Sequence, residues 1–172
     1  MRPISIICLC LAACAAPATV VSSLDEMIPP IEGLRASELH DTFDEVHNGH
    51  PHEAVDIMEP RGTPVHAVVS GMIVKLFLSK PGGNTIYEFD SSGTYCYYYA
   101  HLDRYALNVR EGARVERGAI IGYVGFTGNA KAQAPHLHFE IKKLGQEKEW
   151  WKGSPLNPFQ PLVDAVRRSQ AR

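Results

Sequence analysis

Short apolar or alternating segments recur between residues 37 and 144, and turn-forming residues separate them. The segments favour β-branched and aromatic side chains and cover residues 65–69, 72–78, 85–89, 94–102 and 120–124. Glycine, proline, asparagine and serine fill the intervals, for example at residues 81–84 and 127–129. Many short strands at this spacing are typical of an antiparallel sheet. The pattern therefore predicts an all-β, barrel-like domain with little helix, and residues 162–168 are the only helix that we expect.

The first residues have the pattern of an export signal. Arg2 gives a positive start, and residues 4–13 form an apolar stretch that is too short to span a bilayer. The stretch leads into Leu-Ala-Ala-Cys at residues 11–14, which resembles the lipobox of bacterial lipoproteins. We expect residues 1–13 to be a signal peptide and Cys14 to carry a lipid that holds the protein at a membrane. Ala-Pro-Ala at residues 16–18 leaves soluble secretion as the alternative.

The rest of the chain divides into a tether, a domain and a C-terminal extension. Residues 14–36 lack periodicity and contain two adjacent prolines, which predicts a flexible tether to a domain at residues 37–145. Residues 146–172 contain Trp150, Trp151 and several prolines, and we expect them to pack on the domain rather than to bind sugars. Once Cys8, Cys10 and Cys14 are removed or acylated, only Cys96 remains, so no internal disulfide is possible and a buried strand position is expected.

Composition limits the class of partner. Hydrophobic residues make up 45% and charged residues 21% of the chain, which are ordinary values for a globular domain. The formal net charge of -2 provides no basic field, so we expect no nucleic-acid partner. No apolar run reaches the roughly 18 residues of a membrane span, which excludes a multi-pass membrane protein. The oligomeric state cannot be predicted from these features.

Four of the eight histidines, together with Asp56, form patterns that suggest metal chemistry. In a strand over residues 135–141, His136, His138 and Glu140 would share one face, because successive side chains alternate. A second strand over residues 52–57 would turn His52 and Asp56 the same way, and His101 ends a third strand. Each pattern alone also fits an ordinary structural residue. Combined, two imidazoles and a carboxylate form the nitrogen and oxygen set of a catalytic zinc site, with one position left for water.

The chain resembles the lysostaphin/LytM-type zinc endopeptidases of bacterial cell walls over residues 52–141. Three separated motifs occur in that family's order: HxxxD at His52 and Asp56, the strand-end His101, and HxH at His136 and His138. Glycines at residues 112 and 118 and the Thr-Gly-Asn at residues 127–129 support the match. One departure is Ala54, where the family usually has glycine, although the methyl group removes no ligand.

The resemblance implies a LytM-type peptidase fold and one zinc ion held by His52, Asp56 and His138, with His101 and His136 as catalytic histidines. It implies hydrolysis of peptide cross-links in peptidoglycan, whose peptide stems would be the substrate. The lipobox-like residues 11–14 add the expectation of a periplasmic, outer-membrane-anchored location. The roles of base and oxyanion stabiliser remain open between the two histidines. Surface positions are expected for Glu140 and Asp103. Two alternatives are a non-hydrolytic LytM-type activator of cell-wall amidases, which would lack ligands, and a carrier domain.

Overall fold

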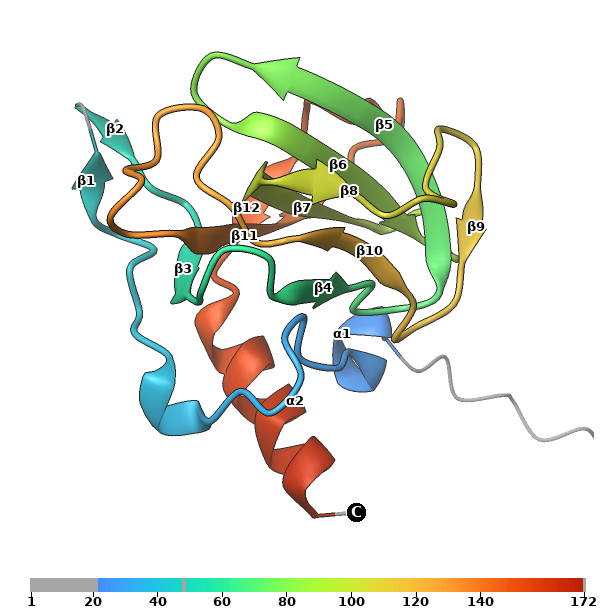
Figure 1. Cartoon of the computed structure of the whole chain (residues 1–172). Helices are drawn as coiled ribbons and strands as arrows, with labels where there is room; N and C mark the ends of the chain where they lie inside the picture. Colours follow the sequence, from blue (N-terminus) through green and yellow to red (C-terminus); the bar gives the residue numbers. More distant parts are fainter. Residues whose placement is uncertain (1–21, 48, 172) are drawn as a thin grey trace, which may run out of the picture.

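The computed structural model describes residues 22–47 and 49–171, and it is built mainly of antiparallel strands (Figure 1). A seven-stranded sheet has the order β12-β11-β7-β6-β5-β9, and β3 pairs with β11 on the edge opposite β7, the same edge that β12 occupies. Its strands are β3 (Val55–Met58), β5 (Gly71–Ser79), β6 (Gly83–Asp90), β7 (Tyr95–Leu102), β9 (Arg114–Val115), β11 (His136–Lys143) and β12 (Ser154–Leu156). Every strand pairing in the described chain is antiparallel, which confirms the predicted class.

A smaller sheet, one hairpin and three helical elements complete the described structure. The smaller sheet consists of β4 (Pro64–His66), β10 (Ile120–Tyr123) and β8 (Arg104–Tyr105). A two-stranded hairpin, β1 (Val46–His47) with β2 (His50–Pro51), projects at one side, and the helices are α1 (Ser23–Glu26), the 3-10 turn η1 (Ala36–Glu38) and α2 (Phe159–Gln170). Within the described residues, no helix has both the length and the apolarity that crossing a bilayer requires.

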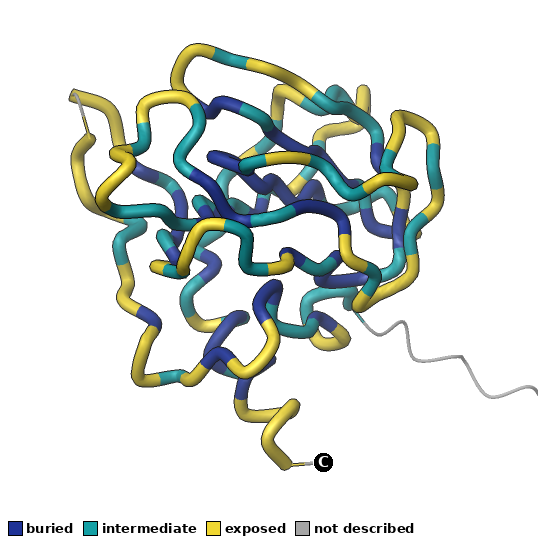
Figure 2. Tube along the Cα trace, viewed as in Figure 1, coloured by how far each residue is buried: buried dark blue, intermediate teal, exposed yellow. Residues whose placement is uncertain are grey.

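The hydrophobic core lies beneath the large sheet, and the alternation of buried and accessible positions is clearest in β11. Leu137, Phe139 and Ile141 of β11 are fully buried, whereas the residues between them remain partly accessible. Tyr97 and Tyr99 of β7 enter the same core, as the dark interior of Figure 2 illustrates. Burial of each such side chain stabilises the fold by roughly 1.5–3 kcal/mol, so the inner face fixes the strands and leaves the outer face available.

Residues 22–36 belong to the folded body, and the expectation of a tether is wrong for this part of the chain. Met27, Ile31 and Leu34 are at most 4% exposed and join the core, although the segment around them, which contains Pro29 and Pro30, forms neither helix nor strand. Arg168 of α2 donates a hydrogen bond to the carbonyl of Met27 at 2.9 Å. Apolar side chains that fill the space between α2 and the sheet need no periodicity, which explains why the segment looked unstructured. Residues 14–21, including Cys14, lie outside the described residues.

The C-terminal segment is also part of the fold, so the boundary expected at residue 145 divides one structure. Strand β12 pairs with β11, and α2 runs under the sheets beside the N-terminal segment (Figure 1). The helix has 12 residues rather than the expected seven, because Pro161 falls in the first turn, where a missing N–H is tolerated. Its buried stripe comprises Leu162, Val163, Ala165 and Val166.

Candidate metal centre

His52 and Asp56 come from the start of β3, but not from one continuous strand. The strand begins at Val55, because Glu53 has a left-handed backbone with φ of 55° that interrupts extension. The expected strand over residues 52–57 is therefore wrong in its first half. Hydrogen bonds from the His52 amide to the Glu45 carbonyl (2.8 Å) and from Glu53 to Phe43 (3.0 Å) hold the bend. Because of this bend, the ring of His52 points towards Asp56.

Strand register brings the HxH motif beside Asp56. In the pairing of β3 with β11, His138 is directly opposite Asp56, and it is opposite Ala100 in the pairing with β7. The alternation of β11 turns His136, His138 and Glu140 to the outer face, as the sequence predicted. The sheet therefore places side chains that are more than 80 positions apart in the sequence on one surface.

Three side-chain atoms that could ligate a metal ion form a nearly equilateral triangle. The Nε2 atom of His52 lies 3.1 Å from Oδ1 of Asp56 and 3.1 Å from Nδ1 of His138, and the third side measures 3.2 Å. Ligands about 2.0–2.1 Å from a tetrahedral zinc ion are about 3.3 Å apart, so the triangle has nearly the right size. A fourth position would remain on the groove side of the triangle.

The hydrogen bonds on the far sides of both rings fix which nitrogens carry lone pairs. Nδ1 of His52 lies 3.0 Å from the Thr42 carbonyl, and Nε2 of His138 lies 2.9 Å from Oε1 of Glu140. Those oxygens only accept, so the outer nitrogens donate. In neutral imidazoles the two facing nitrogens are then acceptors, directed at each other and at a carboxylate. Three acceptors without a hydrogen between them fit a bound cation.

The charge balance of the triangle favours the same conclusion. Burial disfavours the charged form of His138, but hydrogen bonds to Asp56 and Glu140 outweigh it and raise its pKa to about 9. Burial would raise the pKa of Asp56, but the neighbouring His138 and His52 rings prevail and hold the pKa of the carboxyl well below its usual range. The site thus stabilises one positive charge between two carboxylates, and a metal ion can take the place of that proton.

Glu140 is not the surface carboxylate that the sequence suggested. Its side chain is 13% exposed, and Oε1 accepts the bond from His138 described above. The other oxygen, Oε2, lies 2.7 Å from Nζ of Lys142 as an ion pair without hydrogen-bond geometry. A carboxylate behind a ligating imidazole orients the ring and raises its basicity. Asp103, in contrast, contacts no imidazole in the described chain and pairs with Arg61 at 2.6 Å.

His101 and His136 stand beside the triangle without joining it. Nδ1 of His101 lies 2.8 Å from the Thr127 carbonyl, and Nδ1 of His136 lies 2.9 Å from the Ala134 carbonyl. Both Nδ1 atoms therefore donate, which leaves the Nε2 atoms able to accept a proton. The two rings are 4.8 Å apart between centroids. Burial lowers the pKa of His101 to about 4, against the opposing effect of the Thr127 bond, so this imidazole is neutral near pH 7.

All five histidine and aspartate side chains line one groove of about 690 Å³. Loops at residues 81–82 and 129–134 form its walls, and the β1–β2 hairpin contributes His47 and His50. No spacing pattern in the sequence identifies these two histidines as groove residues. His47 stacks on His52 at 4.2 Å, and its donor atom lies within 4.8 Å of those of His52 and Asp56, a looser set than the triangle.

A left-handed glycine fixes the loop that holds His101. Gly128 has φ of 78°, and a Cβ added there would lie 2.3 Å from the Pro81 carbonyl oxygen. Gly112 has a similar φ of 79°, but an added Cβ would meet nothing within 4 Å. Both glycine-to-alanine changes force an unfavourable backbone worth about 1–2 kcal/mol, and only Gly128→Ala adds a clash.

We therefore expect the matched Gly112→Ala to lower the melting temperature by about 2–8 °C and Gly128→Ala, which adds the clash, to lower it by more than about 8 °C. Thermal unfolding followed by circular dichroism measures both. Equal shifts in the two variants would mean that the contact of residue 128 with the Pro81 loop contributes nothing to stability.

Comparison with known proteins gives one consistent family. Residues 50–158, more than half of the chain, match the model described as "Peptidase family M23". Lysostaphin from Staphylococcus simulans is 44% identical over 94 residues, which are 54% of this chain and 18% of lysostaphin. A peptidoglycan DD-endopeptidase of Vibrio cholerae serotype O1 is 37% identical over 97 residues, which are 56% of this chain and 21% of that protein. The chain therefore spans only about a fifth of the length of these relatives.

The solved structures agree with the strand topology. The catalytic domain of lysostaphin from Staphylococcus simulans superposes with a TM-score of 0.56 at 32% identity, covering 78% of this chain and 86% of that domain. The matched family segment contains all three donors of the triangle and both neighbouring histidines. The resemblance that the spaced motifs indicated is confirmed, and the chain belongs to peptidase family M23.

Proposed function

We propose that this protein is a zinc-dependent endopeptidase that hydrolyses peptide cross-links of bacterial peptidoglycan. The observation that carries the proposal is the triangle of His52, Asp56 and His138, with sides of 3.1–3.2 Å, in the wall of an open groove. The names of the relatives support the substrate class, since they include a glycyl-glycine endopeptidase, a peptidoglycan DD-endopeptidase and an L-Ala--D-Glu endopeptidase. Because these enzymes differ in the bond they cut, the bond cut by this protein is left open.

The chemistry of the donor set suits zinc better than calcium or magnesium, which take mostly oxygen ligands. When bound, zinc supplies Lewis acidity that makes water nucleophilic near neutral pH. His52, Asp56 and His138 would hold the ion, and the Thr42 carbonyl and Glu140 would keep the two rings in the tautomer that ligation requires.

His101 and His136 would handle the protons of the reaction. Each ring presents Nε2 as an acceptor, because its Nδ1 atom is committed to a backbone carbonyl. One Nε2 would accept the proton of the attacking water and pass it to the departing amine. The other ring could donate a hydrogen bond from Nε2 to the carbonyl oxygen, as it gains charge, only in its protonated form. Nε2 of His136 also lies 3.8 Å from Oδ2 of Asp56, so this ring is next to a proposed metal ligand.

The groove favours an enzyme over a regulator. An activator of amidases needs no ligands, whereas here two partner oxygens orient the ligand rings and a third residue completes the triangle. Because three acceptors repel each other, the constellation needs a positive charge among them, which either the proton indicated by the raised pKa of His138 or a bound metal ion can supply.

The location that we propose follows from the first residues alone. The apolar stretch at residues 4–13 and the Leu-Ala-Ala-Cys at residues 11–14 support export and a lipid on Cys14. An anchor in the outer membrane would hold the groove close to the cell wall in the periplasm. Soluble export after cleavage near residue 18 is the alternative.

The proposal predicts metal-dependent release of fragments from purified peptidoglycan. Mass spectrometry of the soluble products should reveal cleaved cross-links with a new amine and a new carboxylate. A chelator should abolish the release, and added zinc should restore it, because the triangle alone provides no nucleophile. Failure of zinc-loaded protein to release any fragment would reject the endopeptidase and favour the activator.

A further inference from the structure

A chain of aromatic rings runs from the metal centre across the outer face of the large sheet. Tyr98 lines the groove, and its ring is 5.9 Å from that of His138. Tyr87 follows at 4.6 Å, and Trp150 at 4.7 Å from Tyr87. Trp150 then contacts Trp151 at 5.2 Å. The outer face therefore continues from the groove, without interruption, to two tryptophans.

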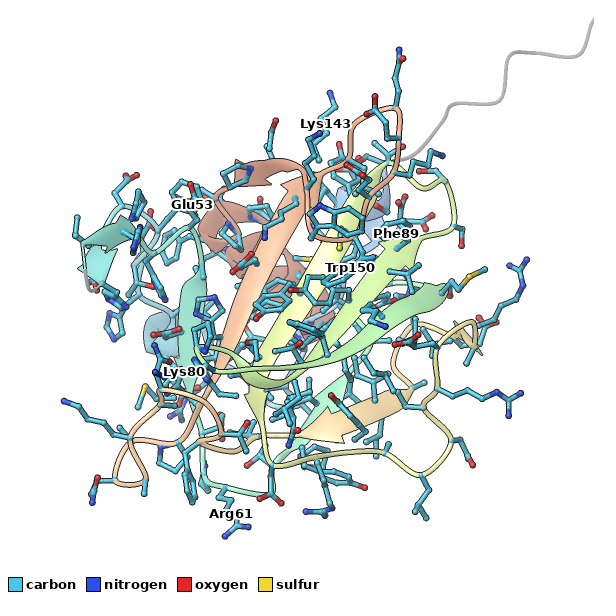
Figure 3. The ribbon with its side chains drawn as sticks, turned by 90° about the horizontal axis from the view of Figure 1, so that it is seen from above. Glu53, Arg61, Lys80, Phe89, Lys143 and Trp150 are labelled. Carbon is cyan, nitrogen blue, oxygen red and sulfur yellow. The ribbon has the colours of Figure 1, made fainter. Side chains whose placement is uncertain are left out.

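The far end of this chain is accessible. Trp150 covers Tyr87 and Tyr98, which are at most 9% exposed, and Figure 3 looks onto this face with Trp150 beside Phe89. Trp151, however, is 58% exposed. Phe77, whose ring is 5.5 Å from that of Trp150, is 40% exposed. A residue needed only to cover the sheet would be buried, as Trp150 largely is, so the exposure of Trp151 needs another reason.

A closed turn holds the two tryptophans in place. The amide of Lys152 donates to the carbonyl of Glu149 at 3.1 Å, and the side chains of these two residues form an ion pair at 3.5 Å. Trp150 and Trp151 are the central residues of this turn, and their rings are at 80° to each other. One ring therefore anchors the turn on the sheet while the other faces outward, so little entropy would be lost when a ligand stacks on it.

The chemistry around the turn fits a sugar. The segment at residues 143–154 also lines a hollow of about 480 Å³ with lysine, glutamate and serine side chains. A pyranose ring has an apolar C–H face that stacks on an aromatic plane and an edge of hydroxyls that need polar partners. Trp151 does not line this hollow, but its exposed indole offers the apolar plane, and Glu149 and Lys152 of the same turn, which do line it, offer the polar partners.

We propose that Phe77, Trp150 and Trp151 form an aromatic platform that binds a sugar ring of the glycan strand while the attached peptide lies in the groove. This inference rests on the proposed function, because the peptide stems of peptidoglycan hang from sugars. The continuity of the ring chain with the groove carries it, and Trp151 supplies the stacking surface.

The test compares Trp151→Ala with the wild-type protein on two substrates. One is insoluble peptidoglycan, and the other is the same cross-linked peptide after an amidase has removed the glycan. We expect Trp151→Ala to weaken co-sedimentation with peptidoglycan and to slow its cleavage by about tenfold. Cleavage of the sugar-free peptide should stay within about twofold, and Trp151→Phe, which keeps a ring, should restore most of the binding.

Leu107→Ala is the matched control, since Leu107 is an exposed apolar side chain outside the platform. Equal losses on both substrates, or no loss of binding to peptidoglycan, would overturn the platform. If the wild-type protein cleaves neither substrate, the proposed endopeptidase fails, and the co-sedimentation result still decides whether Trp151 binds glycan.

Discussion

Replacement of His138 by alanine is expected to remove zinc and hydrolysis together. Nδ1 of His138 forms two of the three sides of the donor triangle, and the remaining pair, His52 and Asp56, offers only two ligands. Loss of a residue that merely orients a ligand typically weakens metal affinity by about 10–100-fold, and loss of a ligand should exceed that. Metal analysis of the dialysed protein should find almost no zinc, and release of peptidoglycan fragments should fall to background.

The control must separate loss of the ligand from loss of the fold, because His138 also donates a hydrogen bond to the buried carboxylate of Glu140. Removing it leaves the 13%-exposed Glu140 with only its Lys142 ion pair, which can lower stability. Circular dichroism and thermal unfolding check the fold, and His66→Ala serves as the matched variant. His66 is a strand histidine whose ring contacts the Pro30 carbonyl at 3.4 Å, away from the groove. A folded His138→Ala protein that keeps one zinc per chain would contradict the proposed ligand set.

Features that depend on local alternation could be predicted from the sequence. Strand β11 is a clear case, because Leu137, Phe139 and Ile141 alternate with His136 and His138. Such a pattern determines which side chains face outward, but it cannot say which strand lies next to them. The pairing of β3 with β11, which brings Asp56 opposite His138, depends on contacts between distant segments. Only the resemblance to a known family linked these motifs beforehand.

Features that depend on tertiary packing could not be predicted. Met27 and Ile31 lie in a segment with two adjacent prolines that forms neither helix nor strand, yet both are buried once α2 and the sheet are in place. The position of Glu140 in the sequence predicts that its side chain points to the outer face of the sheet. It does not predict that the side chain is buried, because the burial comes from Lys142 and the neighbouring strand. The bend at Glu53 is a third case, since a glutamate with positive φ has no sequence signal.

Replacement of His101 by alanine should have the opposite signature, with zinc retained and hydrolysis lost. Its ring stands 5.6 Å from that of His138, and its Nδ1 bonds the Thr127 carbonyl, so it contributes no side to the triangle. Loss of one group that moves protons or stabilises the oxyanion typically slows such reactions by about 10²–10³-fold. Zinc content per chain should equal that of the wild-type protein, whereas the rate of fragment release should fall by this factor.

Backbone strain at His101 calls for a second variant. His101 has φ of 59°, and alanine would keep this left-handed conformation without the Thr127 bond that helps to hold it. His101→Asn is the matched variant, because asparagine tolerates this region but cannot act as an acid or base. Equal loss of hydrolysis in the two variants, with zinc intact in both, would assign the effect to the imidazole. If His101→Asn instead kept the wild-type rate, the role of His101 would be to shape the loop, and proton transfer would fall to His136.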